Sequence, residues 1–294
     1  MPRAALLSIH ARVAGTHAST WQHASLAQIW GPRYSVFVVA ERDRALFTLG
    51  RLPDDARGRQ RAELAAARLQ TLLGDERMTY GAAGRALGVP PNSLRYGTTT
   101  GTIALRWDGA RQPVVWSVPR PAVDPLDARL ELARRYLRVY GPGTALGFAK
   151  WAGLQARSAV TAFDALGDAL LPVRTPVGDG WLAAADEPLL RERSTAPPPA
   201  RLLPSGDAYY LLHGRERALL VPDAKQRNAL WTSRVWPGAV LVGGEIIGTW
   251  RRAQHEVTVE AFGRLARAAR AAIEAEAAAL PLPDLARSIV VRWS

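Results

Sequence analysis

Asn92, Ser93 and Arg95 bring an amide, a hydroxyl and a guanidinium together in one short segment. The segment, Pro90–Tyr96, follows a turn at Gly88 and is predicted to form the second helix of a helix-turn-helix, with these three side chains outward. Asn and Arg can bond the edges of adenine and guanine through two hydrogen bonds, whereas Ser more often contacts phosphate. The alternative interpretation is that Asn92 and Ser93 cap a helix and that Arg95 is solvated.

Other basic and polar side chains have the same potential chemistry. Arg106 and Arg111 belong to a predicted hairpin next to this segment, where they would lie against a phosphate backbone. Arg251-Arg252 follows a strand-like run and could contact phosphate, or could simply be the residues at which a strand ends. Arg33 follows a rigid Gly-Pro pair and could also contact phosphate. The complete set of predicted DNA-contacting residues is Arg33, Arg85, Asn92, Ser93, Arg95, Arg106, Arg111, Lys150, Arg157, Ser158, Thr161, Arg251 and Arg252.

Asn92, Ser93 and Arg95, together with Arg106 and Arg111, can act as one surface only if helices and a hairpin position them. Apolar residues at helical spacing predict a helix over 55–73, and small residues after Met78 predict a short second one. Two strand-like runs, 102–107 and 113–118, flank an Asp-Gly pair, which is the strongest short hairpin signal. Three helices followed by a hairpin predict a winged helix over residues 55–120.

The same order of elements recurs further along the chain. Helices are predicted over 124–140, 144–151 and 156–166, and hairpin strands over 170–175 and 181–184. Lys150 lies on the second of these helices, and Arg157, Ser158 and Thr161 lie on the third, which is the candidate recognition helix. The repetition predicts a second winged helix over residues 121–185.

The flanking regions complete a five-part organisation. Residues 1–54 are predicted to form a partial N-terminal winged-helix-like unit, with helical stretches at 4–13, 25–30 and 42–49 and a buried strand at 34–39. Residues 186–200, which contain three consecutive prolines, are predicted to be a linker. Residues 201–294 are predicted to form a β-rich module, with strands at 201–212, 218–221, 239–242, 245–250 and 288–293 and a helix at 259–279. The predicted fold class is α+β.

Positive charge is concentrated in particular segments. The chain of 294 residues carries a formal charge of +12, and nearly all of its basic residues are arginine. Residues 1–52, 78–120 and 201–252 each carry a net +4, while the other stretches are close to neutral. Because arginine usage of this kind also follows GC-rich coding, the position of the charge says more than its total. The pattern favours an anionic partner that meets those three segments.

Several classes of site are disfavoured by composition. The absence of cysteine excludes disulfides, thiol nucleophiles and thiolate zinc sites, and the five histidines have no metal-ligand spacing. Glycine-rich phosphate loops, dinucleotide fingerprints and the hydrolase elbow are missing. No apolar stretch approaches a membrane span, and no secretory signal is recognisable. We therefore expect a soluble, cytoplasmic protein that uses no metal or other cofactor and does not bind membranes.

Four stretches carry a resemblance to a known family. Gly31–Val39, the paired helix-turn-helix units, Arg201–Asp207 and Gly248–Arg251 are similar to the winged helix proteins of the AlkZ-like (YcaQ-type) DNA glycosylase family. The resemblance covers nearly the whole chain. It implies tandem winged helices around a concave basic surface that grips duplex DNA. It also implies that some members excise alkylated bases or unhook crosslinks without a cofactor.

Catalysis in that family is tied to a glutamine, an aliphatic residue, and then glutamine or aspartate. The nearby match is Gln28-Ile29-Trp30, in which tryptophan cannot hold a water as an amide oxygen does. A second register, based on Arg33–Val39, places the motif before Met1. Neither register identifies a catalytic residue. Asp207, after a strand-like run, could position a water but has the sequence context of a turn former.

The tryptophans add one more possibility. Trp30, Trp107, Trp116, Trp231 and Trp236 could stack on an extruded base, although most tryptophans belong to cores. The predicted function is binding of double-stranded DNA by a glycosylase-like repair protein, favoured as a monomer. If it is active, it is a cofactor-independent glycosylase. The alternatives are a non-catalytic transcriptional regulator and winged helices that contact only proteins.

Overall fold

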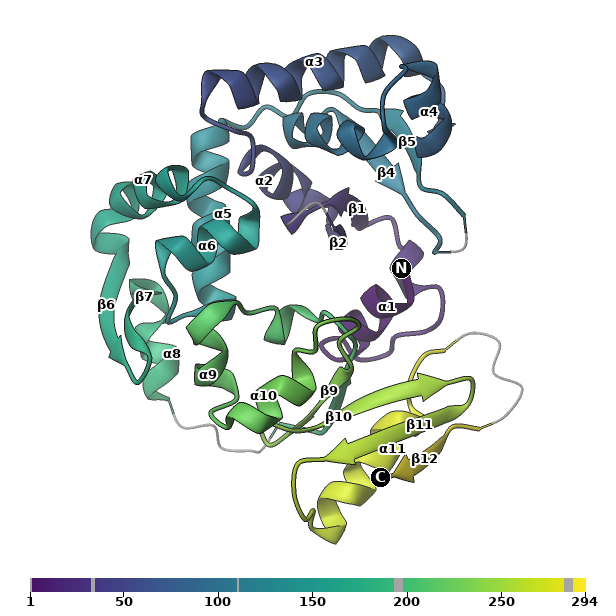
Figure 1. The fold of residues 1–294 in the computed structure, drawn as a ribbon, viewed down its shortest axis with the longest axis vertical. Coiled ribbons are helices and arrows are strands. Elements are labelled where there is room, and N and C mark those ends of the chain that lie inside the picture. Colours follow the sequence, from purple (N-terminus) through teal and green to yellow (C-terminus); the bar gives the residue numbers. More distant parts are fainter. Residues whose placement is uncertain (1, 33–34, 110, 193–197, 283–287) are drawn as a thin grey trace. The chain divides into compact units, whose positions relative to one another are not determined.

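The protein divides into two compact units in a computed structural model that describes residues 2–32, 35–109, 111–192, 198–282 and 288–294. Unit 1 is built from Gln22–Glu187. Unit 2 combines Arg3–Trp21 with Pro188–Ser294, so a segment from near the start of the chain packs with the C-terminal third (Figure 1).

Unit 1 contains a sheet with the strand order β2-β1-β4-β5-β3. Its strands are β1 (Leu26–Trp30), β2 (Val36–Ala40), β3 (Met78–Thr79), β4 (Ile103–Arg106) and β5 (Val114–Ser117), and α2 (Arg44–Leu49) follows β2. The helical prediction for residues 25–30 is wrong. Residues Leu26–Trp30 pair antiparallel with β2 along their whole length, and Gln28 also pairs with Leu105 of β4. These non-local hydrogen bonds override the local preference of a short apolar segment.

Three further elements pack on this sheet. They are α3 (Ala56–Leu73), α4 (Tyr80–Ala86) and the 3-10 segment η4 (Pro91–Thr100). The Asp55 carboxylate accepts the Gly58 amide and so caps α3, and Thr79 caps α4 by accepting the Ala82 amide. Their buried faces form one core with the sheet, which includes Trp30, Leu69, Leu73, Ala83, Leu94, Ile103, Leu105 and Val115.

The segment Pro90–Tyr96, predicted as the second helix of the first helix-turn-helix, belongs to a 3-10 helix that extends to Thr100. Its hydroxyls explain the difference, because those of Ser93, Thr98, Thr99 and Thr100 each donate to the carbonyl three residues earlier, at 2.7–2.8 Å. Such side-chain bonds compete with the regular α-helical ladder. The segment also packs closely, since a Cβ at Gly97 would lie 2.9 Å from the Ala66 nitrogen of α3.

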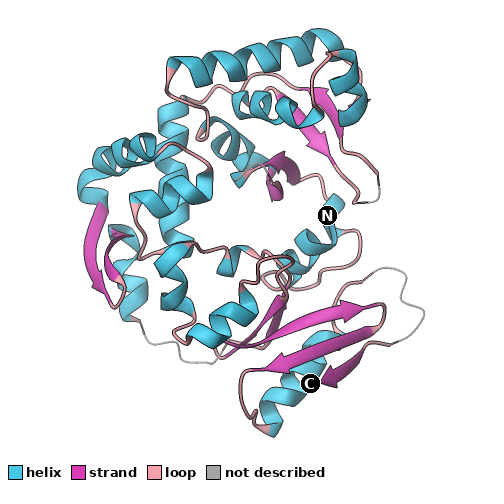
Figure 2. Ribbon diagram, in the orientation of Figure 1, coloured by secondary structure: helices cyan, strands magenta, loops and turns pink. Residues whose placement is uncertain are grey.

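The second half of unit 1 follows the predicted order closely. It contains α5 (Pro125–Tyr140), α6 (Ala145–Ala152), α7 (Ala156–Leu166) and the hairpin β6 (Leu170–Thr175) and β7 (Gly178–Ala183), as Figure 2 shows. Asp124 caps α5 by accepting the amides of Leu126 and Asp127. A short helix, α8 (Glu187–Arg191), occupies part of the stretch that was predicted to be a linker.

Unit 2 contains a second sheet, with the order β12-β11-β10-β9-β8. Its strands are β8 (Arg201–Leu203), β9 (Gly238–Val242), β10 (Glu245–Ala253), β11 (Glu256–Ala261) and β12 (Val290–Trp293). All pairings are antiparallel except that of β11 with β12. Its helices are α1 (Pro2–His10), α9 (Arg217–Leu220), α10 (Ala224–Leu230) and α11 (Arg267–Ala278). The expected α+β class is therefore confirmed.

Three predictions for unit 2 are wrong in detail. The strand that begins at Arg201 ends at Leu203, and residues 217–220 form helix α9 instead of a strand. The helix predicted over 259–279 is in fact strand β11 followed by α11. Within β11 the alternate residues Val257 and Val259 are fully buried, which is the two-residue period of a strand. A short apolar run carries little information on its own about helix or strand.

None of the helices among the described residues is long and apolar enough to cross a membrane. The five-part domain division, and the assignment of residues 55–120 and 121–185 as winged helices, remain predictions.

Candidate nucleic-acid interface

An open cleft of about 670 Å³ lies in unit 1 beside the sheet. We call it the aromatic cleft. Its lining consists of Trp30, Ser35, Val36, Tyr80, Arg95, Trp107, Gly109, Arg111, Gln112 and Pro113. The lining combines aromatic rings with two arginines, and none of the described residues in it carries a carboxylate. The cleft is therefore a cationic surface with apolar walls.

Two of the aromatic side chains in the lining, Trp107 and Tyr80, have their polar atoms bonded within the protein. The Trp107 indole Nε1 donates to the Arg111 carbonyl at 2.6 Å, and the Tyr80 hydroxyl donates to Asn92 Oδ1 at 2.5 Å. Gln112 is also engaged, because its Oε1 accepts the Gly81 amide at 3.0 Å. These bonds fix the rings in place, and they leave the faces of the rings as the part that can contact a ligand.

The two arginines of the cleft differ in their surroundings. The Arg95 guanidinium lies 5.8 Å from the ring centres of both Trp30 and Tyr80, at the outer range of a cation–π contact. Arg111 is exposed at the end of the β4–β5 connection. Both of these predicted residues therefore belong to one surface, and Asn92 joins it through its bond with Tyr80.

A second cleft of unit 1, of about 420 Å³, is also lined by arginines but includes acids. We call it the charged cleft. In it Asp54 accepts from Arg129 at 2.9 Å and from Ser158 at 2.6 Å, and Asp55 accepts from Gln155 at 3.0 Å. Burial alone would raise the pKa of Asp54, but the Ser158 hydroxyl and the Arg129 charge outweigh it and lower that pKa. This cleft carries its own counter-ions, so it attracts an external anion less.

Ser158 must be corrected as a predicted DNA contact. Its side chain is 3% exposed, and its hydroxyl is bonded to Asp54, because it faces the inside of the helix packing in α7. The other candidates of that region, Lys150, Arg157 and Thr161, are exposed. Only part of the predicted group on α6 and α7 is thus available to a partner.

The remaining candidates lie in several places. Arg85 at the end of α4 and Arg106 at the end of β4 are exposed, and Ser93 donates to the Pro90 carbonyl. In unit 2, Arg251 donates to the Val235 carbonyl at 3.0 Å and Arg252 donates to the Gln254 carbonyl. Arg33 lies outside the described residues.

Most of the selected tryptophans are structural. Trp30 and Trp231 are buried, Trp116 lies under Arg77, and Trp236 packs near Tyr210. Trp107 is half-buried and forms a wall of the aromatic cleft. It is therefore the best placed of the five to contact a ligand.

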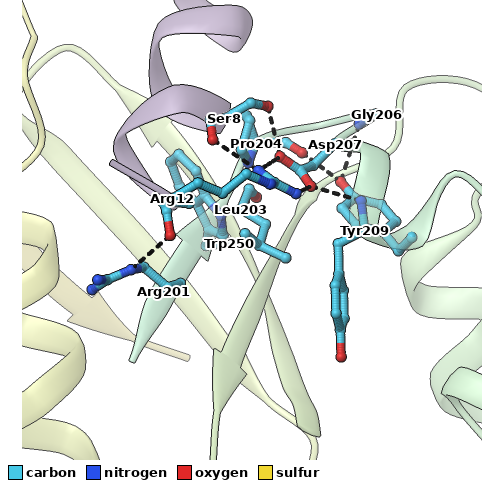
Figure 3. Close-up of polar contacts among 11 residues, drawn as sticks. Ser8, Arg12, Arg201, Leu203, Pro204, Gly206, Asp207, Tyr209 and Trp250 are labelled. Carbon is cyan, nitrogen blue, oxygen red and sulfur yellow. Dashed lines mark hydrogen bonds and ion pairs between the residues drawn. The ribbon is translucent and has the colours of Figure 1, made fainter. Parts of the chain in front are cut away.

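Asp207 has a structural environment in unit 2 that excludes the proposed role with water. Figure 3 shows its carboxylate held by the Ser8 hydroxyl at 2.6 Å, by both terminal nitrogens of Arg12 at 2.7 and 3.0 Å, and by the Tyr209 amide at 2.8 Å. The residue is 2% exposed. Its function is to join α1 to the loop after β8, and no side of the carboxylate is left open.

Comparison with known proteins adds an independent observation. The family model "DNA glycosylase AlkZ-like" matches residues 1–281. The chain belongs to the AlkZ-like DNA glycosylase family. Its fold is similar to that of Streptomyces sahachiroi DNA glycosylase AlkZ, with a TM-score of 0.73 and 16% identity over 99% of this chain and 90% of the other. No curated protein matches the chain.

Gln28-Ile29-Trp30, the nearby match to the catalytic motif of the AlkZ-like family, is engaged in the fold. Gln28 Oε1 accepts the Trp107 backbone amide at 2.7 Å, and the Trp30 side chain, at 1% exposed, packs in the core. One acceptor position of the Gln28 amide oxygen is thus used by the backbone, and the Trp30 side chain has no oxygen to offer to a water. Among the described residues there is also no group of three or more His, Cys, Asp or Glu that could hold a metal.

Tyr80 and Gln112 were not predicted from the sequence as components of the site. Tyr80 was counted only as part of a short helix, and Gln112 only as a hairpin residue. A signal did exist, since both lie in the stretch 78–120 that carries a net charge of +4. Their contribution depends on strand pairing, because β3 pairs with β5 and so brings Tyr80 beside the hairpin.

Proposed function

We propose that this member of the AlkZ-like family binds duplex DNA through unit 1, with residues 55–120 acting as a winged helix. Arg95 and Arg111 contact phosphates, and exposed Arg85 and Arg106 add charge on the same segment. The observation that supports this proposal most directly is the aromatic cleft, whose described lining residues include two arginines and no carboxylate. Binding of this kind is tolerant of sequence and sensitive to salt.

A contribution of residues 121–185 to binding is part of the same proposal. Lys150, Arg157 and Thr161 are exposed along α6 and α7 and form its second contact. We expect this contact to be the weaker one, because residues 121–185 carry a net charge of only +1 and the neighbouring cleft contains Asp54 and Asp55.

A titration of affinity against salt tests the binding proposal. Fluorescence anisotropy with a labelled, fully paired duplex should give a log Kd that rises linearly with log salt, with a slope of about 0.9 per phosphate contacted. Duplexes of unrelated sequence should bind within about threefold of each other. Absence of binding at low salt contradicts the proposal.

We further propose that Gln28-Ile29-Trp30 does not support base excision. The supporting observations are the bonded amide of Gln28 and the buried indole of Trp30. Incubation of the protein with alkylated duplex, followed by chromatographic detection of released bases, should show no release above a protein-free sample. Release that is unchanged in Gln28→Ala would show that other residues perform the chemistry, and release that is lost in it would contradict the proposal directly.

The bonded amide oxygen of Gln28 and the buried indole of Trp30 also favour a second candidate function, that of a non-catalytic DNA-binding regulator. A regulator would protect a defined sequence in footprints of genomic fragments and would show a Kd for that sequence far below the non-specific one. Uniform protection across fragments would exclude this candidate and leave the sequence-tolerant mode.

A further inference from the structure

The connection between β4 and β5 holds the main chain of Arg111 at two points. The Arg111 amide donates to Asp108 Oδ1 at 3.0 Å, and the Arg111 carbonyl accepts from the Trp107 indole Nε1 at 2.6 Å. The side chain of Arg111 is exposed. A guanidinium on an anchored main chain loses less conformational freedom on meeting a phosphate than one on a mobile loop does. The position of this arginine therefore depends on what holds Trp107.

Trp107 is itself held in two ways. Its ring packs against the core that the sheet shares with α3 and α4, and its backbone amide donates to Gln28 Oε1 at 2.7 Å. Gln28 lies on β1, opposite Leu105 of β4, and Trp107 comes directly after the last residue of β4. The side-chain oxygen of Gln28 thus provides an acceptor for an amide at the point where the strand ends.

Loss of that acceptor would act on the connection as a whole. A half-buried main-chain amide without a partner has to move toward water or find another acceptor. Trp107 bonds Arg111 through its indole, so a shift of the Trp107 main chain also loosens the Arg111 main chain. The bonds therefore form one series, which runs from Gln28 through Trp107 to Arg111.

We propose that Gln28 is a positioning residue for duplex binding, because its amide oxygen fixes Trp107 and Trp107 fixes the main chain of Arg111. This inference rests on the proposed contact of Arg111 with phosphate. It goes beyond that contact by giving the glutamine of Gln28-Ile29-Trp30 a role in affinity instead of in base excision. Gln28 touches no DNA in this role. Its effect on affinity therefore exists only while Arg111 is present.

A cycle of variants tests this dependence, with Kd for a fully paired duplex measured by anisotropy across salt concentrations. Arg111→Gln should weaken binding and lower the salt slope by about 0.9, the value for one phosphate contact. Gln28→Met keeps the length of the side chain but has only a weak acceptor. It should cause at least about half of the loss in log Kd and in salt slope that Arg111→Gln causes. The variant with both substitutions should bind like Arg111→Gln alone, within about 1.5-fold.

The outcomes separate this inference from the function on which it rests. If Arg111→Gln causes the same loss with and without Gln28→Met, Gln28 acts independently of Arg111 and the proposal is overturned. An unchanged Kd and salt slope in Gln28→Met also overturn it. If the unmodified protein does not bind the duplex, or if Arg111→Gln has no effect on it, the proposed duplex-binding function is refuted instead.

Two further variants show that the acceptor matters. Gln28→Glu keeps an oxygen for the Trp107 amide, and its added negative charge weakens binding overall. In the Gln28→Glu background Arg111→Gln should still cause its full loss, whereas a loss reduced as in Gln28→Met contradicts the proposal. Gln155→Met is the matched control, since it removes another glutamine bond of unit 1, from Gln155 Nε2 to Asp55 at 3.0 Å. It should leave the loss caused by Arg111→Gln unchanged, and a reduced loss there would overturn the assignment to Gln28.

Hydrogen exchange tests the first bond of the series without DNA. The backbone amide of Trp107 should exchange about tenfold faster in Gln28→Met than in the unmodified protein, and at the unmodified rate in Gln155→Met. Equal exchange in all three proteins would show that Gln28 does not hold the Trp107 main chain, and the proposal would fail.

Discussion

The segments 55–120 and 121–185 have the same order of helices and hairpin but place their aromatic side chains differently. In the first, Trp107 and Tyr80 line a cleft with Arg95 and Arg111. In the second, the rings pack on one another, with Tyr136 at 5.5 Å from both Phe148 and Trp151. The common element order therefore does not determine which segment presents a ligand surface. The burial of the aromatic rings distinguishes the two segments, because only exposed ring faces can contact a ligand.

The largest expected effect is a difference in protein stability between a substitution in the packed rings of residues 121–185 and one in the cleft-lining rings of residues 55–120. Trp151→Ala should lower the free energy of unfolding by about 3–5 kcal/mol, because Trp151 is 7% exposed within the aromatic cluster and its removal leaves a cavity. Trp107→Ala removes a half-buried ring and should cost no more than about half of that. Chemical denaturation of both variants measures the difference. Equal losses would show that the two segments do not differ as described.

The next effect should separate the segments by their affinity for paired DNA. Arg95→Gln/Arg111→Gln should weaken binding about 10-fold or more at low salt and lower the salt slope by about 2, because two phosphate contacts are lost. Lys150→Gln/Arg157→Gln removes the same formal charge and should weaken binding by less than about threefold. A larger effect of the second pair would reverse the proposed roles.

A smaller effect concerns the corrected residue of the second segment. Ser158→Ala should destabilise the protein by about 1 kcal/mol, because it removes a buried hydrogen bond to Asp54. Its affinity for paired DNA should be unchanged, since the hydroxyl does not reach the surface. A measurable loss of affinity without a loss of stability would restore Ser158 as a DNA contact.

The smallest effect is a dependence of stability on pH. The pKa of Asp54 is lower in the folded state than its ordinary value of 3.8, so the unfolded chain binds more protons between these two values. The contribution of Asp54 is therefore present above about pH 4 and is lost as the pH falls through the folded pKa. It should stay below about 1 kcal/mol, because the side chain is 41% exposed and water screens the pair with Arg129. Asp54→Asn should show a flatter stability profile below pH 4 than the unmodified protein does.

Much of the fold could be predicted where local signals were strong. Asp55 and Asp124 cap the helices that they were expected to begin, and the helix 156–166 and the strand 170–175 have the predicted bounds. The predictions failed where the secondary structure depends on partners that are distant in sequence. Strand β1 is an example, because its conformation depends on pairing with β2 and β4. The run Ala218–Val221 was too short for its period to distinguish a helix from a strand.

The candidate site was predictable only as a list of side chains. The types and charges of Arg95 and Arg111 indicated a polyanion from the sequence, but their meeting with Trp30 and Tyr80 depends on strand order. Ser158 shows the opposite case, in which a polar residue at a plausible position faces inward because Asp54 lies opposite. Sequence patterns give the chemistry of a side chain, whereas its neighbours require the folded chain.

The bond between Arg12 and Asp207 joins positions that are 195 residues apart. During translation, α1 leaves the ribosome well before Asp207, with which Arg12 forms this bond. The continuous stretch of unit 1 emerges in the meantime and is free to fold. Leu6 and Leu7, which are 2% and 4% exposed in the finished protein, stay accessible to chaperones through this interval. Helix α1 is therefore made before the continuous stretch of unit 1 but reaches its final position only when the C-terminal part of unit 2 has been made.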